Sequence, residues 1–429
     1  MMIPHLTKRL IVAFGSLLLL SGCVRMTVAW APLTPKGPPA DPPILTSLAD
    51  GSAIADADRW EDERDLLKDM LQREVYGYLP PSGRTSVVET RMIDPAALEG
   101  KARYQEYDIA VTPIFAEDVS AASAQFTMAV LSPTDVEGPV PVIMTETFCP
   151  RWAALPHPNA TKPSGAGEAE MPGFVSYLFG RYICTPPLEM IIDAGFALAV
   201  AESTEIVPDS GDAGLAALDR LAVGYTEKDT RWGAIAAWGW VFSRMADVLA
   251  AEEAFDGERL AAYGHSRYGK AALFAGAFDE RIAAVIAHQS GTGGASLNRR
   301  KVGESVAAIT KSYPHWFAPS YAGFAGREED MRSDQHHLIA LMAPRPLMLG
   351  NARRDVWSDP NGAFKAARGA SPVYSMLDTS GLTVDRLDRF DPEAGLSFWM
   401  RPGTHGVVEE DWPAFLAFLS AHLQAPGGR

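Results

Sequence analysis

The sequence has 429 residues, of which 47% are hydrophobic and 21% are charged, and this composition is typical of an α/β protein with a large buried core. Its formal net charge of −15 at pH 7 argues against nucleic acid or another polyanion as an electrostatically attracted partner. The histidines and cysteines show none of the spacings that metal ligands require, so neither a metal nor another cofactor is expected.

The first residues predict export. Two basic residues precede an apolar run over 10–20, which has the length of a secretory signal and is too short for a permanent membrane span. The run ends in Leu20-Ser21-Gly22-Cys23, which looks like a bacterial lipobox with Cys23 as the lipidated residue. We expect a signal peptide over 1–22, a proline-rich tether over 23–55, and a periplasmic or outer-membrane-anchored lipoprotein. An ordinary secretory signal, giving a secreted protein, is the alternative.

Runs of strand length alternate with runs of helix length over residues 56–429, which we predict to be one catalytic domain. The predicted helices are 59–74, 232–251, 362–377 and 412–423. The predicted parallel strands are 142–145, 197–201, 260–263, 283–287, 347–350 and 396–400. Antiparallel strands are expected within 86–131. The alternation predicts a doubly wound, three-layer α/β sandwich with a mostly parallel central sheet, in which ligands bind at the carboxyl ends of the strands.

The stretch 151–180 is rich in glycine and proline, has no obvious strand partner, and is interpreted as an insertion over the active site. Cys149 and Cys184 lie on either side of it. In an oxidising compartment these two residues either form a disulfide or remain two separate buried thiols.

Ser266 lies in the segment 263–270, between the end of a predicted strand and a run of helix-forming residues. A sharp turn there would raise the hydroxyl above the sheet and place it at the N-terminus of the following helix, where backbone N–H groups can receive a developing oxyanion. Gly264 and Gly269 flank the turn because side chains there would collide with neighbouring backbone. The spacing is G-x-S-x-x-G and not the common G-x-S-x-G, so a plain loop serine is the alternative.

A nucleophilic serine of an α/β-hydrolase is followed along the chain by an acid and then by a histidine. Asp355 follows a predicted strand, and His405 lies on the glycine-flanked loop after the last predicted strand. We therefore predict a triad of Ser266, His405 and Asp355 in an α/β-hydrolase. A surface or core histidine and a loop-capping aspartate are the competing interpretations. Asp359, which precedes a proline, is the better candidate for capping.

These residues resemble the glucuronoyl esterases of carbohydrate esterase family 15, in their bacterial form, from about residue 60 to the C-terminus. Seven ordered segments carry the resemblance, at 264–270, 290–294, 299–304, 314–317, 334–338 with 343–346, 355–360 and 401–405. Many family members have a catalytic Glu where this chain has Gln289, and an amide cannot carry the charge that stabilises an imidazolium. Bacterial members often carry the acid after the following strand, so the resemblance assigns this role to Asp355.

The resemblance also implies the substrate contacts. Residues matching Lys270, Glu304 and Trp357 contact the hydroxyls of a glucuronate ring, and the residue matching Arg267 helps to hold the oxyanion. Lys270 follows Ser266 by four residues, so the two share one face of the predicted helix. From the residues alone, Lys270 could equally be a solvated helix residue, Glu304 the ion-pair partner of a nearby arginine, and Trp357 a core residue.

Together these features predict a serine esterase that hydrolyses the ester between (4-O-methyl-)D-glucuronic acid of glucuronoxylan and lignin alcohols, through an acyl-enzyme. Another carbohydrate esterase, such as one that removes acetyl groups from xylan, is one alternative. A non-catalytic polysaccharide-binding surface protein is the other. The expected partner is the lignin–carbohydrate ester substrate, with no nucleic acid and no membrane contact beyond the lipid anchor. The protein is expected to be a monomer.

Overall fold

The computed structural model describes residues 45–424 apart from 117–121, 164–165, 167–172 and 300–301. The predicted signal peptide, the predicted lipidation at Cys23 and most of the predicted tether lie outside the described residues. Within the described part, none of the helices has both the length and the apolar character that crossing a membrane would require.

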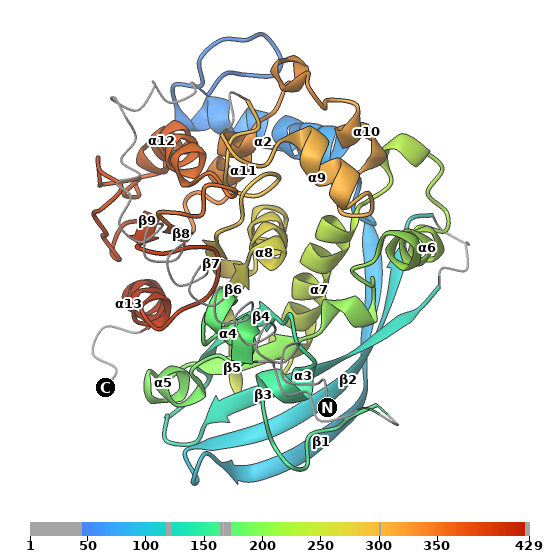
Figure 1. Cartoon of the computed structure of the whole chain (residues 1–429), viewed down its shortest axis with the longest axis vertical. Coiled ribbons are helices and arrows are strands. Elements are labelled where there is room, and N and C mark those ends of the chain that lie inside the picture. The colour runs from blue at the N-terminus through green and yellow to red at the C-terminus, as the bar shows by residue number, and fades with distance from the viewer. Residues whose placement is uncertain (1–44, 117–121, 164–165, 167–172, 300–301, 425–429) are drawn as a thin grey trace, which may run out of the picture.

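The described strands form one sheet of nine, and their bounds are β1 Ser82–Ala97, β2 Ala102–Ile114, β3 Ala124–Pro133, β4 Val140–Glu146, β5 Ala197–Ala201, β6 Phe255–His265, β7 Ile282–His288, β8 Leu347–Ala352 and β9 Leu396–Arg401. Their order across the sheet is β1-β2-β3-β5-β4-β6-β7-β8-β9 (Figure 1). The strands from β5 to β9 in this order are parallel to one another, and β1 to β3 extend the sheet as an antiparallel wing.

The described α-helices are α2 Ala57–Leu71, α3 Arg151–Ala154, α4 Gly173–Phe179, α5 Leu188–Asp193, α6 Gly211–Leu221, α7 Ala234–Leu249, α8 Arg267–Phe278, α9 Val306–Ser312, α10 Pro319–Ala322, α11 Gln335–Ala340, α12 Pro360–Met376 and α13 Asp411–Leu423. Short helical turns complete the described elements, at η1 Gln72–Tyr76, η2 Ser203–Glu205, η3 Lys228–Thr230 and η4 Glu328–Asp330.

Helices cover both faces of the sheet, which confirms the predicted three-layer arrangement. Apolar side chains of α2, α7, α8, α11 and α12 pack on one face, and those of α5 and α13 pack on the other (Figure 1). The parallel strands lie between these layers and show no apolar–polar alternation; all five residues of β5, for example, are buried. Each predicted strand and helix occurs, with its ends moved by a few residues.

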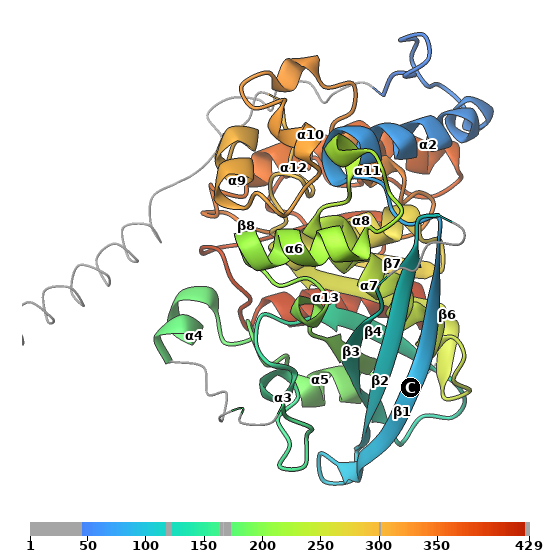
Figure 2. The same ribbon diagram turned by 90° about the vertical axis from the view of Figure 1, so that its right-hand side faces the viewer.

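The carboxyl ends of β6, β7, β8 and β9 lie side by side in the sheet. The loops that follow these strands carry Ser266, Gln289, Asp355 and His405 respectively. Figure 2, turned by 90°, shows α4 of the predicted insertion projecting from the body on the side opposite β1 and β2. The fold therefore brings residues that are up to 139 positions apart in the sequence to one edge of the sheet.

The first turn of α11 contains a buried histidine that caps the helix. His337 Nδ1 accepts a hydrogen bond of 3.1 Å from the backbone N–H of Asp334, the N-cap residue. The Asp334 side chain in turn accepts from the backbone N–H of His337, and the two bonds form a capping box. Burial, helped by the charge of Arg299, lowers the pKa of His337 to about 3. The imidazole is therefore neutral in the folded protein at every pH at which the protein would normally be handled.

This neutral histidine makes stability depend on pH. Below about pH 6.5, the ordinary value of an imidazole, the unfolded chain binds a proton that folded His337 does not. Its contribution is therefore fully present above that pH and is lost as the pH falls, by up to about 2 kcal/mol at pH 5. His337→Gln keeps a capping acceptor but removes the titrating imidazole. The free energy of unfolding, measured with urea, should therefore fall less between pH 7 and pH 5 in the variant than in the unaltered chain. Equal losses in the two proteins would contradict this assignment.

Candidate active site

Ser266 lies at a sharp turn between β6 and α8. Its φ is +56° and its ψ is −122°, a conformation that non-glycine residues rarely adopt, and its N–H donates to the carbonyl of His288 at 2.8 Å. The turn leaves no room on either side. A Cβ on Gly264 would lie 2.0 Å from the carbonyl oxygen of Tyr268, and one on Gly269 would lie 2.9 Å from that of Gly264. Ser266 therefore occupies a strained turn at the N-terminus of a helix, as predicted.

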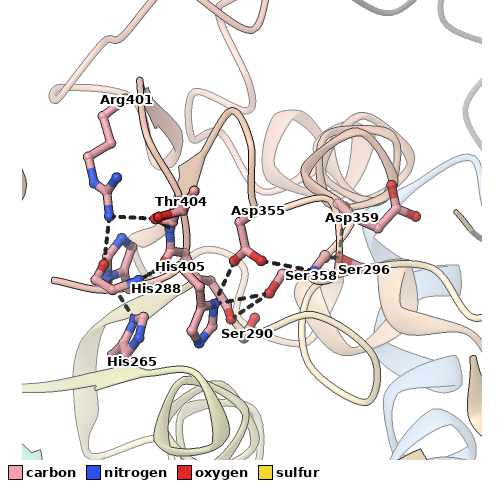
Figure 3. A network of polar contacts seen from close by, with 12 residues as sticks. His265, His288, Ser290, Ser296, Asp355, Ser358, Asp359, Arg401, Thr404 and His405 are labelled. Atoms are coloured by element: carbon pink, nitrogen blue, oxygen red, sulfur yellow. Dashed lines mark hydrogen bonds and ion pairs between the residues drawn. The ribbon is translucent and has the colours of Figure 1, made fainter. Parts of the chain in front are cut away.

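His405 and Asp355 are hydrogen-bonded to each other. The imidazole Nδ1 lies 2.7 Å from the Asp355 Oδ2 (Figure 3). Asp355 Oδ1 also accepts a 3.3 Å bond from the N–H of Ser358, which holds the carboxylate on its loop. The capping role falls to Asp359, whose Oδ1 accepts from Gly362 at the start of α12 at 3.0 Å. The two aspartates of this loop therefore have different contacts, as the sequence suggested: Asp355 bonds to His405 and Asp359 caps α12.

The Asp355 carboxyl is ionised at neutral pH. Its burial raises the pKa, but the hydrogen bond from His405 and the charge of that imidazole outweigh burial and hold the pKa of Asp355 below its usual value. Asp355 can therefore stabilise a positive charge on His405.

A cavity of about 740 Å³ brings the predicted site residues together. Its lining includes Ser266, Arg267, Lys270, Gln289, Glu304, Asp355, Trp357 and His405. All eight belong to the described part of the chain, and within it no hydrogen bond joins the Ser266 hydroxyl to the His405 imidazole. In hydrolases this bond is often long or poorly aligned until substrate binds.

The predicted sugar contacts all line the cavity but differ in exposure. Lys270 is only 4% exposed, and its Nζ donates to the carbonyls of Ser290 and, at 2.9 Å, of Thr292. Trp357 is 57% exposed, so its indole is presented at the mouth of the cavity. The backbone N–H of Glu304 donates to the carbonyl of Trp357 at 3.0 Å and joins their loops. Lys270 is therefore not a solvated helix residue and Trp357 is not a core residue.

Arg267 is held by an aspartate that the sequence analysis did not select. Its Nε lies 3.1 Å from Asp209 Oδ2, and its guanidinium lies 4.5 Å from the ring centre of Phe148. The other oxygen of Asp209 accepts from the ring nitrogens of His315, at 3.0 Å, and Trp316, at 2.8 Å. Asp209 thus fixes a cavity cation and a cavity indole together, although it lies in a loop without any recognisable motif.

Two buried histidines lie beneath His405. The rings of His265 and His405 are 4.6 Å apart, and Nδ1 of His265 lies 3.2 Å from Nδ1 of His288 (Figure 3). Burial lowers the pKa of both His265 and His288 well below the usual value, and the positive charge of neighbouring groups lowers it further. Both rings are therefore neutral, and His265 packs against the His405 imidazole without competing for its proton.

Cys149 and Cys184 are joined by a disulfide, with Cα atoms 5.5 Å apart, and both line the cavity. The bond closes the segment that contains the predicted insertion. The described part of that insertion lies against the His405 loop, because Val407 N donates to the carbonyl of Phe179 at 2.7 Å and Tyr182 N donates to that of Val407 at 3.1 Å. The bonded alternative for the two cysteines is thus the one that the structure contains.

The disulfide should stabilise both the fold and the cavity wall. For a sequence separation of 35 residues, its loss is expected to cost roughly 3–4 kcal/mol of unfolding free energy. Cys149→Ser with Cys184→Ser should therefore lower the urea midpoint, and it should raise KM more than it lowers kcat, because the wall carries no reacting group. A double variant with an unchanged midpoint would show that the covalent link contributes nothing. Each single variant also breaks the bond and should therefore lose about as much stability as the double variant.

Within the described residues, no group of three or more His, Cys, Asp or Glu side chains is arranged to hold a metal ion.

The chain is similar to known esterases over nearly its whole length. A family model described as glucuronyl esterase of fungi matches residues 190–378. Carbohydrate esterase MZ0003, from an unknown prokaryotic organism, is 31% identical over 412 residues, which cover 91% of this chain and 90% of that relative. A family 15 glucuronoyl esterase from Teredinibacter turnerae has a solved structure that superposes with a TM-score of 0.72, at 30% identity, over 89% of this chain and 88% of the other.

The chain belongs to carbohydrate esterase family 15, the glucuronoyl esterases. It is therefore a carboxylic ester hydrolase with the α/β-hydrolase fold. A fungal member of the family, the 4-O-methyl-glucuronoyl methylesterase of Phanerochaete carnosa, is 30% identical over 207 residues, which cover 43% of this chain and 51% of that relative. The sequence similarity to this fungal relative thus covers about half of each protein, whereas the similarity to the prokaryotic relatives covers about nine tenths of this chain.

Membership of family 15 also explains how the seven matching segments relate to one another. Six of them contribute residues to the lining of the cavity. The seventh lies behind it, where Gln335 donates to the carbonyl of Gly294 and to Tyr76 Oη, at 2.9 Å for the latter. Six of the seven segments therefore form the wall of one cavity, and the seventh holds that wall from behind.

Proposed function

We propose that this glucuronoyl esterase hydrolyses the ester between the carboxyl group of (4-O-methyl-)D-glucuronic acid in glucuronoxylan and an alcohol of lignin. The observation that carries the proposal is the cavity of about 740 Å³ in which Ser266, the bonded pair of His405 and Asp355, and the cations Arg267 and Lys270 meet. The fungal relative named as a 4-O-methyl-glucuronoyl methylesterase supports the same acyl group.

The proposed mechanism uses side chains and backbone N–H groups of the chain together with one water molecule. Ser266 Oγ attacks the uronate carbonyl while His405 takes the hydroxyl proton, and the Asp355 carboxylate stabilises the resulting imidazolium. The tetrahedral oxyanion forms beside the N-terminus of α8 and the Arg267 guanidinium, and each such donor contributes roughly 3 kcal/mol to the transition state. The alcohol leaves with the proton from His405, and water, deprotonated by the same imidazole, releases glucuronate from Ser266.

The rim of the cavity suits an aromatic alcohol. Among the described residues, large apolar side chains that are more than a third exposed include three that line the cavity, Phe179, Tyr313 and Trp357. Tyr313 is stacked on Trp316 with ring centres 3.8 Å apart, which gives one wall a flat aromatic face. Aromatic faces of this kind pack against sugar rings and phenyl rings alike. Arg267 and Lys270 would then hold the uronate, and the exposed rings would contact the alcohol.

The acyl group can be tested directly. We expect kcat/KM for the methyl ester of 4-O-methyl-glucuronic acid, or of glucuronic acid, to exceed that for the methyl ester of galacturonic acid and that for p-nitrophenyl acetate. Product analysis by chromatography would identify the released acid. Preferential release of acetate from acetylated xylan would instead favour the alternative carbohydrate esterase. Binding of glucuronoxylan without hydrolysis of any ester would favour the polysaccharide-binding alternative.

We propose further that the protein is exported as a monomeric lipoprotein, with Cys23 carrying the lipid. The support is the basic, apolar and Leu-Ser-Gly-Cys pattern of the first 23 residues. Labelling with an alkyne fatty acid in a bacterial host should mark the unaltered chain and not Cys23→Ala. Equal labelling of both would contradict lipidation, and light scattering of the soluble variant would give the oligomeric state.

A further inference from the structure

Gln289 is a buried polar residue held in a strained conformation next to the catalytic loop. It follows β7 directly, is 1% exposed, and has a φ of +48°, which residues other than glycine rarely adopt. Its backbone N–H donates to the carbonyl of Gly350 at 2.7 Å, so its main chain is fixed between β7 and β8. A strained, buried residue beside reacting groups is a candidate for a functional role.

The side chain of Gln289 contacts both neighbours of His405. Its Oε1 accepts from the backbone N–H of Gly406 at 2.8 Å, and its Nε2 donates to the carbonyl of Thr404 at 3.4 Å. A single amide thus holds the peptide groups on either side of the imidazole. We propose that Gln289 is a positioning residue that fixes the His405 loop so that the imidazole can serve Ser266. This proposal rests on the esterase mechanism given above.

Arg401 is a second group that holds the same loop. Arg401 Nη2 donates to the carbonyls of Thr404, at 3.2 Å, and Gly406, at 2.6 Å (Figure 3). The guanidinium is in turn fixed by both oxygens of Asp411, each 2.9 Å from its Nε. The N–H of Gly406 needs an acceptor, and within the described part of the chain the Gln289 side chain provides it. A guanidinium has donors only, so the amide supplies a contact that the arginine cannot.

The chemistry of an amide explains why a carboxylate would be a poor substitute here. Gln289 must accept one hydrogen bond and donate another, and an ionised carboxylate can only accept. A Glu at this position would keep the bond from Gly406 but would place a negative oxygen against the carbonyl of Thr404. It would also add a second negative charge beside the imidazole, which favours the protonated form. In this chain the acid function belongs to Asp355, and position 289 is used to hold the histidine loop.

The test compares Gln289→Met and Gln289→Glu with a matched control, Gln72→Met. Gln72 makes the same pair of bonds far from the cavity, because its Oε1 accepts from Leu79 N at 2.9 Å and its Nε2 donates to the carbonyl of Lys68 at 3.5 Å. Met is close to Gln in length and removes both bonds. For each protein, kcat and KM are measured on the methyl ester of glucuronic acid over a range of pH. The rate at which a fluorophosphonate reacts with Ser266, and the melting temperature, are measured in parallel.

Gln289→Met should lower kcat and the fluorophosphonate rate about 10- to 100-fold, since a 1 Å displacement of a catalytic group has an effect of this size, while KM changes little. Gln289→Glu should recover part of kcat and should shift the acidic limb of the pH profile to higher pH. Gln72→Met should lose stability and keep both rates. The proposal is overturned if Gln289→Met keeps the rates of the unaltered chain, or if Gln289→Glu leaves the pH profile unmoved.

The failure of the proposed function would be visible separately. If the unaltered chain reacts with the fluorophosphonate but hydrolyses no glucuronate ester, the proposed substrate is wrong, and the labelling rates of the variants still decide the role of Gln289. If the unaltered chain does not react with the fluorophosphonate at all, Ser266 is not an activated nucleophile, and the positioning role fails together with the mechanism.

Discussion

Replacing Ser266 with alanine is expected to reduce kcat on the methyl ester of glucuronic acid by about 10⁵- to 10⁶-fold, the effect of removing the nucleophile from a serine hydrolase. The variant retains Arg267, Lys270 and the N-terminus of α8, all of which line or face the cavity. Residual catalysis over water by these groups is expected, because charge stabilisation and binding survive the loss of the nucleophile. KM or the dissociation constant of the ester should change little, since the hydroxyl is small and binding depends on the walls.

Isothermal titration of the variant with the ester checks that binding is retained. A pre-steady-state burst experiment checks that the nucleophilic step is lost. The unaltered chain should show a burst if the second step limits turnover, and Ser266→Ala should show none. Ser320→Ala is the matched control, because it removes a hydroxyl that donates to the carbonyl of Arg73 at 2.8 Å, outside the cavity. A Ser266→Ala variant with the activity of the unaltered chain would mean that another group attacks the ester.

The sequence predicted the sheet and singled out Ser266, Asp355 and His405 as a candidate triad, because the strands and these three residues have local signals. Each parallel strand is a short apolar run, and β5 is the extreme case, with its five residues all buried. The glycines that its turn requires indicate Ser266. Asp355 and His405 are indicated by their positions directly after predicted strands. The distinction between Asp355 and Asp359 also followed from a local rule, since an aspartate before a proline favours the start of a helix.

What the sequence did not reveal depends on contacts between distant segments. Asp209 bonds to Arg267, 58 positions away, and to His315, 106 positions away. The sequence around Asp209 contains no motif that predicts either contact. Gln289 was recognised only as a departure from the family pattern. Its bonds to Thr404 and Gly406 span 115 and 117 positions and depend on the register of β7, β8 and β9. Whether Cys149 and Cys184 are bonded could not be predicted for the same reason, because the sequence does not show how far apart two cysteines lie in the fold.

Replacing Asp355 with asparagine is expected to lower kcat by about 10⁴-fold with the fold intact, as in other serine hydrolases whose triad acid is changed to an amide. The Asp355 carboxylate accepts the Nδ1–H of His405 at 2.7 Å, which leaves Nε2 as the acceptor for the serine proton. In the Asp355→Asn variant the new amide could donate to Nδ1 instead, and the imidazole would then carry its proton on the wrong nitrogen. Gln289 cannot compensate, because its amide is neutral and bonded to the loop backbone.

The pH dependence of this loss distinguishes a charge effect from a structural one. The pKa of Asp355 is lowered in the folded protein, so its charged form contributes stability that is fully present above about pH 4, the unfolded value, and is lost only as the pH falls towards the folded value. The carboxylate is therefore charged throughout pH 5–8, and Asp355→Asn should move the acidic limb of the kcat profile to lower pH, because the imidazolium loses the negative charge beside it. Asp359→Asn is the matched control: asparagine also caps helices, so the variant should keep α12 and kcat. If Asp359→Asn lost as much activity as Asp355→Asn, the loop and not the carboxylate of residue 355 would be responsible.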